Sequence, residues 1–255
     1  LQGMIDDLVS KCDSDPIEEG LAPWEDVTSG IPMAVARAIS VAEADLQEPG
    51  LLPDGWREQI ADAGTNKDIP VVGITGTGGA GKSSLTDELV LRLRSDFPEL
   101  GLAILSVDPT RRRTGGALLG DRIRMNAVYG PGCFMRSMAT RDAGSELSGA
   151  IEQAVGVCKA AGFGLVILET SGIGQGNSAV MDHCDIGVYV MTPEFGAPSQ
   201  LEKIDMLDFA DLVVVNKFER RGGEDALRDV RKQFRRNRKL FDAADEDIPV
   251  FGTVA

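Results

Sequence analysis

The segment Gly76–Ser83 constrains the fold of this chain more than any other part of the sequence. It reads Gly-Thr-Gly-Gly-Ala-Gly-Lys-Ser and matches G-x-x-x-x-G-K-[ST] at every fixed position. An apolar, β-branched run at 69–75 precedes it, as a phosphate loop requires. An amphipathic pattern at 83–93 follows it, and we expect Leu85, Leu89 and Leu93 to lie on one face of a helix there. Glycines let backbone N–H groups converge on phosphate oxygens, and a helix N-terminus adds a favourable dipole. We therefore predict that Lys82 reaches the β- and γ-phosphates and that the Ser83 hydroxyl ligates Mg²⁺. The alternative is a glycine-rich turn without a ligand.

The rest of the chain alternates expected strands with expected helices. Several of the strand runs are apolar without alternation, which is typical of strands buried on both faces of a parallel sheet. We predict an α/β fold, a P-loop NTPase with a doubly wound, mainly parallel sheet flanked by helices. Residues 1–68 are expected to form a linker and a small helical subdomain. Residues 69–255 are expected to form the P-loop domain, with its C-terminal end truncated. The expected strands are 69–75, 102–107, 133–138, 165–169, 186–191, 212–216 and 248–252, and the expected helices are 31–46, 54–61, 83–93, 147–158 and 224–241.

Composition narrows the class of protein further. The formal net charge is −14, so nucleic acid and anionic membranes are not expected partners. No apolar run approaches the roughly 18 residues that span a bilayer, and no cleavable leader is visible at the start. The four cysteines are scattered without a C-x-x-C pair, which is typical of reduced thiols. We expect a cytoplasmic protein.

A P-loop enzyme needs a second acid near Mg²⁺, and three candidates follow from the sequence. Glu169 ends the run Leu-Val-Ile-Leu-Glu, and the spacing E-x-x-G to Gly172 resembles the D-x-x-G segment whose glycine amide meets the γ-phosphate. Asp108 closes the strand at 102–107, at the sheet edge where ligands bind. Asp121 lies in 109–124, which we interpret as a mobile loop of γ-phosphate sensors. The alternatives are a strand-end acid facing solvent and, for the arginines of this loop, a solvated basic segment.

The segment Asn216-Lys217-Phe218-Glu219 follows a late strand and resembles the N-K-x-D guanine motif. A carboxylate at the fourth position accepts hydrogen bonds from guanine N1–H and the exocyclic amine, which adenine does not offer in that arrangement. Glu219 is one methylene longer than the usual aspartate, so the pocket must shift. The alternative is a polar strand end. Thr253-Val254-Ala255 loosely matches the short segment that lies beside the base in GTPases.

Taken in order, GTGGAGKSS, SVDPT with GDRIRM, ETSGIGQ and NKFE resemble the G-protein chaperones of adenosylcobalamin-dependent acyl-CoA mutases. This is the methylmalonyl-CoA mutase-associated GTPase family. Glu219 and the acidic lead-in make the chain most similar to the G-domain fused inside isobutyryl-CoA mutases. The resemblance covers about residues 30 to 255.

The resemblance implies a GTP-binding and GTP-hydrolysing switch that needs Mg²⁺ and serves a mutase, in the same polypeptide or separate. Adenosylcobalamin would belong only to that partner or parent protein, and the full-length protein is expected to be a homodimer. The implied catalytic residues are Lys82, Asp108, Asp121 and Glu169, and the implied Mg²⁺ ligands are Ser83, Asp108, Asp121 and Glu169. The implied nucleotide-binding residues are Gly78, Gly79, Ala80, Gly81, Lys82, Ser83, Ser84, Arg124, Gly172, Asn216, Lys217 and Glu219.

Three other functions stay open at this point. A P-loop kinase would transfer the γ-phosphate to a small molecule, although Asn216–Glu219 speaks against it. A non-catalytic module would only bind nucleotide. A nickel-delivery GTPase would use His183 and Cys184, but one histidine without paired cysteines argues against a transition-metal site. Because Ile173 occupies the position of the usual water-orienting glutamine, hydrolysis without a partner should be slow.

Overall fold

A computed structural model describes residues 3–5, 7, 20–109, 125–140, 145–170, 181–196 and 206–255, with backbone alone at 108–109, 139–140, 145–148 and 206. The chain divides into two compact units, Leu1–Asn66 with Glu152–Gly162, and Lys67–Ile151 with Phe163–Ala255. The first unit thus takes in Glu152–Gly162, which a division at residue 68 would assign to the second domain. That sequence-based division stays a prediction.

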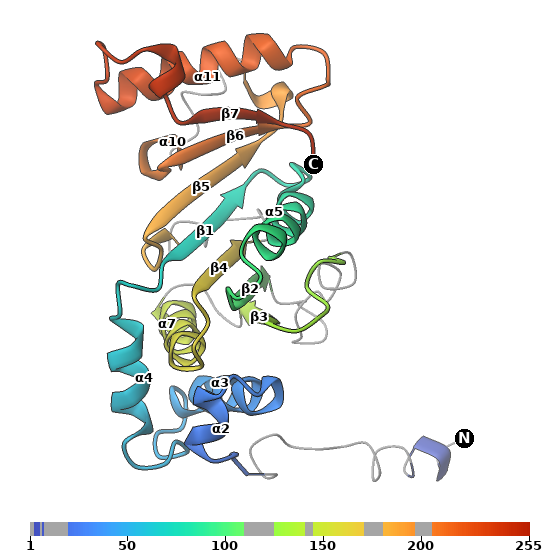
Figure 1. Cartoon of the computed structure of the whole chain (residues 1–255), viewed down its shortest axis with the longest axis vertical. Helices are drawn as coiled ribbons and strands as arrows, with labels where there is room; N and C mark the ends of the chain where they lie inside the picture. The colour runs from blue at the N-terminus through green and yellow to red at the C-terminus, as the bar shows by residue number, and fades with distance from the viewer. Residues whose placement is uncertain are drawn as a thin grey trace. The chain divides into compact units, whose positions relative to one another are not determined.

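The second unit is built on a parallel β-sheet. Within the described residues, seven strands lie in the order β3-β2-β4-β1-β5-β6-β7, and every neighbouring pair is parallel (Figure 1). This confirms the predicted α/β class. The strands are β1 Val71–Gly76, β2 Leu102–Pro109, β3 Cys133–Thr140, β4 Leu165–Thr170, β5 Ile186–Met191, β6 Leu212–Asn216 and β7 Val250–Thr253.

The strand order puts the phosphate loop at a natural binding crevice. β1 lies between β4 and β5, and the chain builds the sheet outward in opposite directions from this point. Ligands of open α/β sheets bind beyond the carboxyl ends of the strands at such a switch point. α5 (Lys82–Asp96) begins there, directly after the loop that follows β1. At the amino ends of the strands, Asp185 and Asp211 accept hydrogen bonds from the N–H groups of Val71 and Gly187, at 2.9 and 2.8 Å.

One face of the sheet carries a core shared with α5. Ile74, Ile104 and Ile167 from three neighbouring strands pack there with Val90 of α5. The predicted stripe of Leu85, Leu89 and Leu93 on α5 is wrong at its middle position, because Leu89 is 37% exposed while Thr86 and Val90 are fully buried. In an α-helix, each step of four residues rotates about 40° beyond a full turn, so a row of residues at i, i+4 and i+8 drifts away from the buried face.

α10 (Met206–Phe209) and α11 (Gly223–Arg238) cover a second core, which includes Met191, Val213, Val230 and Phe234. The predicted helix at 224–241 is too long at its end. It stops at Arg238, because Lys239 adopts the left-handed conformation, with a φ of 56°, and Phe241 beyond it is 67% exposed. Two single-turn 3₁₀ helices, η1 (Pro193–Phe195) and η2 (Asp245–Asp247), complete the described elements of this half of the sheet.

α5 also anchors the chain that enters β3. The carboxylate of Asp87 accepts hydrogen bonds from the N–H groups of Asn126 and Ala127, at 3.1 and 2.7 Å. Arg94 donates to the carbonyl of Ala127 at 2.6 Å. The segment that follows residue 124 is therefore tied to the same helix that starts at the phosphate loop.

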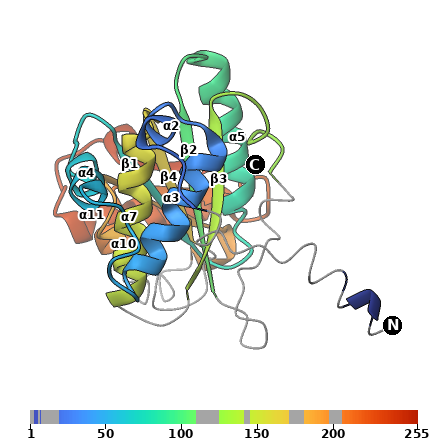
Figure 2. The ribbon, with the colours of Figure 1, turned by 90° about the horizontal axis from the view of Figure 1, so that it is seen from below.

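The first unit consists of α2 (Trp24–Thr28), α3 (Pro32–Asp45), α4 (Trp56–Gly64) and the C-terminal part of α7 (Ser145–Ala160), as Figure 2 shows. Trp24 and Trp56 meet edge to face, with ring centroids 4.7 Å apart. The buried Lys159 of α7 donates to the carbonyl of Asn66 at 2.7 Å, just beyond the end of α4. Among the described residues, no helix is long and apolar enough to span a membrane.

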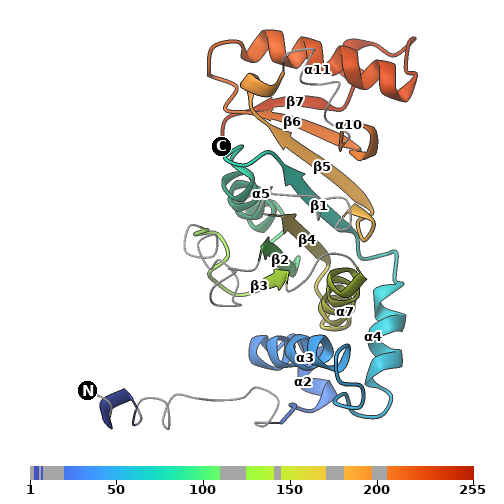
Figure 3. The same cartoon turned by 180° about the vertical axis from the view of Figure 1, so that it is seen from behind.

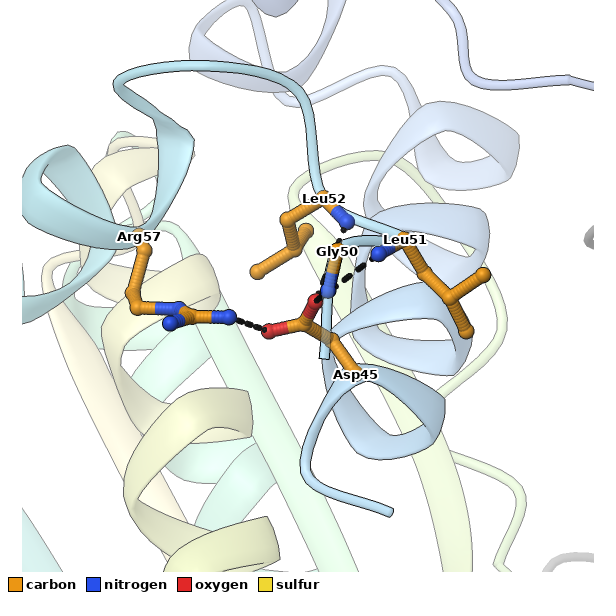
Figure 4. A network of polar contacts seen from close by, with 5 residues as sticks. All are labelled: Asp45, Gly50, Leu51, Leu52 and Arg57. Atoms are coloured by element: carbon orange, nitrogen blue, oxygen red, sulfur yellow. Dashed lines mark hydrogen bonds and ion pairs between the residues drawn. The ribbon is translucent and has the colours of Figure 1, made fainter. Parts of the chain in front are cut away.

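A buried carboxylate organises the turn between α3 and α4 (Figure 4). Oδ1 of Asp45 accepts hydrogen bonds from three successive N–H groups, those of Gly50, Leu51 and Leu52, at 2.8, 3.0 and 3.2 Å. Oδ2 pairs with the guanidinium of Arg57. Burial alone would raise the pKa of Asp45, but the amide of Gly50, the Arg57 guanidinium and the other two amides together lower it. Asp45 is thus held ionised although it is 4% exposed.

Candidate nucleotide-binding site

The loop at Gly76–Ser83 has the geometry that its glycines require. Gly76 has a φ of 147°, and a Cβ there would lie 1.9 Å from the carbonyl oxygen of Val190 on β5. Gly81 precedes α5 in the left-handed conformation, and a Cβ on it would lie 2.6 Å from Nδ2 of Asn216. At Gly78, by contrast, a Cβ would meet nothing within 4 Å. The loop is therefore tightly held at both ends and open in the middle.

The N-terminus of α5 faces this open loop without a side-chain cap. The first N–H groups of an α-helix have no intrahelical acceptor and can therefore bind a ligand. Together with the helix dipole they favour an anion such as phosphate. The buried Lys82 ammonium lies against the same loop, donating to the carbonyls of Gly76 and Thr77 at 3.3 and 3.1 Å.

Ser83 and Glu169 meet across the gap between α5 and β4. The Ser83 hydroxyl donates to Oε1 of Glu169 over 2.6 Å, and Glu169 is 1% exposed. Asp108 lies near the carboxyl end of β2, the strand next to β4. Hydroxyl and carboxylate oxygens are the hard donors that Mg²⁺ prefers, so the donor set present here fits that ion. Among the described residues, no group of three or more His, Cys, Asp and Glu side chains is placed to hold a metal ion.

The guanine-type motif contacts the phosphate loop directly. The fully buried Asn216 donates from Nδ2 to the carbonyl of Ala80 at 2.8 Å, and Lys217 donates from Nζ to the carbonyl of Gly79 at 2.7 Å. Lys217 does so from a left-handed backbone, with a φ of 57°, a conformation that costs of order 1 kcal/mol in a non-glycine residue. Two motifs that lie 136 residues apart are therefore joined into one site.

The last residues of the chain complete this junction. Oδ1 of Asn216 accepts from the Thr253 hydroxyl at 3.0 Å and from the Ala255 N–H at 3.2 Å. Figures 1, 2 and 3 all show the C-terminus beside the start of α5. The exposed Glu219 lies in the turn after β6, which the hydrogen bond from Arg220 N to Lys217 O closes.

A second contact braces that turn from the next loop. Glu194 of η1 pairs with Arg220 at 2.9 Å. Hydrogen bonds from the Thr192 hydroxyl, the Glu194 amide and Arg220 lower the pKa of Glu194 to about 2. Gly196 follows, where a Cβ would lie 2.4 Å from Cβ of Ala226, so this loop closely approaches α11.

The structure brings together Lys82, Ser83, Glu169, Asn216 and Lys217 from three separate segments of the sequence. Asp121, Arg124 and Gly172 lie outside the described residues, and only the backbone of Asp108 is described. The role of each residue in nucleotide binding stays a prediction. Sequence reasoning missed Thr192 and Glu194, because no motif marks them; their sole signal is a position after a buried strand.

A family model for the methylmalonyl-CoA mutase-associated GTPase MeaB matches residues 35–250. The chain belongs to this family. Among proteins of similar sequence, the fused isobutyryl-CoA mutases of Geobacillus kaustophilus and Nocardia farcinica are 54% and 58% identical to this chain. Both alignments cover 100% of this chain, and 24% and 23% of those proteins. The MeaB-family chain thus spans about a quarter of the fused mutases that it matches.

Among solved structures, the LAO/AO transport system kinase resembles this MeaB-family chain, with a TM-score of 0.61 and 23% identity. The match covers 91% of this chain and 67% of that one. At this identity the likeness establishes the shared fold alone. The family assignment from sequence and the P-loop fold from structure agree, so the chain is a GTPase-type P-loop protein.

Proposed function

We propose that this chain binds GTP with Mg²⁺ and slowly hydrolyses it, as the nucleotide-controlled chaperone of an adenosylcobalamin-dependent acyl-CoA mutase. The observation that supports GTP most strongly is the junction of Asn216 and Lys217 with the carbonyls of Ala80 and Gly79. Because the base motif is hydrogen-bonded to the phosphate loop, a ligand that contacts both would carry a base and phosphates, as a nucleotide does.

The phosphates would lie over Gly78–Gly81 and the first N–H groups of α5, with the Lys82 ammonium turned from its carbonyl acceptors onto the β- and γ-phosphates. Ser83 and Glu169 would hold Mg²⁺ with Asp108 and Asp121, and the ion would offset charge that develops on the phosphate oxygens. Arg124 and the Gly172 amide are proposed contacts of the phosphates. Intrinsic rates of about 10⁻⁴ to 10⁻² s⁻¹ are the scale for GTPases without an external activator.

Glu219 is the proposed reader of guanine. Its carboxylate is exposed in a turn that Lys217 and Arg220 hold in place, so it is available to accept two hydrogen bonds from the base. With adenine in the site, that carboxylate would be buried without a hydrogen-bond donor, and this cost would weaken ATP binding.

The mutase is proposed as the partner because the relatives that align with the whole of this chain are named fused isobutyryl-CoA mutases. Isobutyryl-CoA and adenosylcobalamin would then be ligands of other parts of such a protein. The homodimer and the cytoplasmic location expected for the full-length protein stay predictions.

The test is phosphate release from purified chain with GTP and Mg²⁺, compared with ATP and with chelated metal. We expect slow release that needs Mg²⁺ and that falls at least about a hundredfold in Lys82→Ala, because a phosphate contact is lost. Lys232→Ala, which removes an exposed lysine of α11, is the matched control and should be unaffected. A failure to release phosphate over hours despite tight GTP binding would instead favour a non-catalytic module. Transfer of phosphate to a metabolite would favour the kinase.

A further inference from the structure

A row of small polar side chains lies under the proposed magnesium site. In the sheet, Ser106 of β2 is in register with Glu169 of β4 on one side and with Ser137 of β3 on the other. Neighbours in register on parallel strands point to the same face of a sheet. Glu169 points to α5, because it accepts from Ser83, so both serines lie on the α5 face as well.

Thr86 adds a fourth polar group from the helix side. It follows Ser83 by three residues, so the two lie one above the other on the same face of α5. Thr86 is fully buried and Ser106 is 1% exposed. The hydroxyl oxygens of Thr86, Ser106 and Ser137, which we call the hydroxyl layer, are buried and have no hydrogen-bond partner among the residues that the structure describes.

Such a layer is costly unless something else satisfies it. Burying a hydroxyl without a partner costs about 1–3 kcal/mol, and most buried polar groups of native proteins are paired with protein or ordered water. The neighbouring row of the sheet, two residues earlier, holds Ile104 and Met135. Serine side chains are much smaller, so the hydroxyl layer has less side-chain volume than the row beside it. A buried water typically makes about three hydrogen bonds, which the hydroxyls and a carboxylate can supply.

We propose that the hydroxyl layer holds ordered water, and that Ser106 is a positioning residue that fixes Glu169 through this water. A carboxylate has about four lone-pair sites, so Glu169 can accept from water while it also accepts from Ser83. Groups that orient a metal-binding carboxylate typically contribute 10- to 100-fold to metal affinity. The positioning role rests on the proposed function, whereas the water itself does not.

Ser106→Ala tests the two parts separately. In the nucleotide-free chain, loss of a water-bonded hydroxyl should lower the midpoint of thermal unfolding by about 2–4 °C. Removal of a hydroxyl that truly lacks a partner should raise it, which would overturn the proposal. A crystal structure should show water within hydrogen-bond distance of Ser106 Oγ in the wild type, and a dry site there would also overturn it.

The positioning role is tested by the Mg²⁺ concentration that gives half-maximal GTP hydrolysis. The affinity of the nucleotide-bound chain for Mn²⁺ is a second measurement, which does not depend on turnover. Both should weaken about tenfold in Ser106→Ala, while the KM for GTP at saturating Mg²⁺ stays unchanged. A lower unfolding midpoint with unchanged metal dependence would refute the positioning role.

Ser40→Ala is the matched control, since it removes a hydroxyl that donates to Ala36 O within α3, and it should leave metal dependence unchanged. If Ser106→Ala does not fold, Ser137→Ala carries the same test from the edge strand β3, where the residue is half-buried. Absence of GTP turnover in the wild type would refute the proposed function, and the unfolding and crystallographic readouts would still decide on the water.

Discussion

Replacing Asn216 by leucine should disconnect the base motif from the phosphate loop while leaving the core filled. Leucine has the same branching and the same number of side-chain heavy atoms as asparagine, so the change removes hydrogen bonds without leaving a cavity. The side chain makes three such bonds, to Ala80 O at 2.8 Å, Thr253 Oγ1 at 3.0 Å and Ala255 N at 3.2 Å. A typical bond contributes about 1 kcal/mol net, and the carbonyl of Ala80 is buried and would be left without this donor. Because the exposed Ala255 can turn to water, we expect a total loss of about 2–3 kcal/mol.

Two assays follow from this magnitude. Thermal unfolding followed by circular dichroism should show a midpoint lower by roughly 4–12 °C for a domain of this size. Calorimetric titration with GDP should show affinity weaker by about 30-fold or more, because about 2 kcal/mol of preorganisation is lost at the site.

Thr253→Val is the matched control, since it removes one bond to Asn216 and leaves the bond to Ala80 intact. It should lower stability by no more than about 1 kcal/mol and change GDP affinity little. If Asn216→Leu loses the expected stability yet binds GDP within about threefold of wild type, the reasoning is wrong and Asn216 only supports packing.

Three further predictions concern other parts of the chain. Asp45→Asn should cost about 1–2 kcal/mol near neutral pH, because a charged acceptor for three amides becomes neutral. The pKa of Asp45 in the folded chain lies below its ordinary value of 3.8, so the extra stability of the wild type over Asp45→Asn is fully present above that pH and is lost as pH falls through the folded pKa. Urea unfolding of both proteins at several pH values checks this. A stability difference that grows on acidification would contradict it. Gly76→Ala should cost roughly 3 kcal/mol or more, because its Cβ would lie 1.9 Å from Val190 O, whereas Gly78→Ala should leave stability unchanged; equal midpoints of thermal unfolding would refute the steric argument. Burial and the charges of Asp185 and Asp182 raise the pKa of Cys184 to about 12. Iodoacetamide should therefore alkylate Cys184 about a thousandfold more slowly in the folded chain than in the unfolded chain. Mass spectrometry of timed samples measures both rates, and similar rates would contradict the burial of this thiol.

The strands and the phosphate loop were predictable because local chemistry decides them. Pro70 and Pro249 lack N–H groups, however, and the strands predicted to start at 69 and 248 begin only at Val71 and Val250. The exposed Leu89 and the end of α11 at Arg238 were not predictable, because they depend on which helix face meets the sheet and on one left-handed residue.

At the site, motifs identified Lys82, Ser83, Glu169 and Asn216, since each belongs to a recognisable local pattern. The contacts that join them were out of reach, because Asn216 and Ala80 become neighbours only through the strand order. The hydroxyl layer is similar: Ser106 and Ser137 are ordinary strand residues until the register of the sheet aligns Ser106 with Glu169 on one side and with Ser137 on the other.

The central claim, a guanine-nucleotide site, is tested most directly by calorimetric titration of the chain with GDP, GTP and ATP analogues, with and without Mg²⁺. We expect guanine nucleotides to bind at least about a hundredfold more tightly than adenine nucleotides, and Mg²⁺ to strengthen binding of the triphosphate. Equal binding, or a preference for adenine, would contradict the role of Glu219 and the proposal that this chain uses GTP.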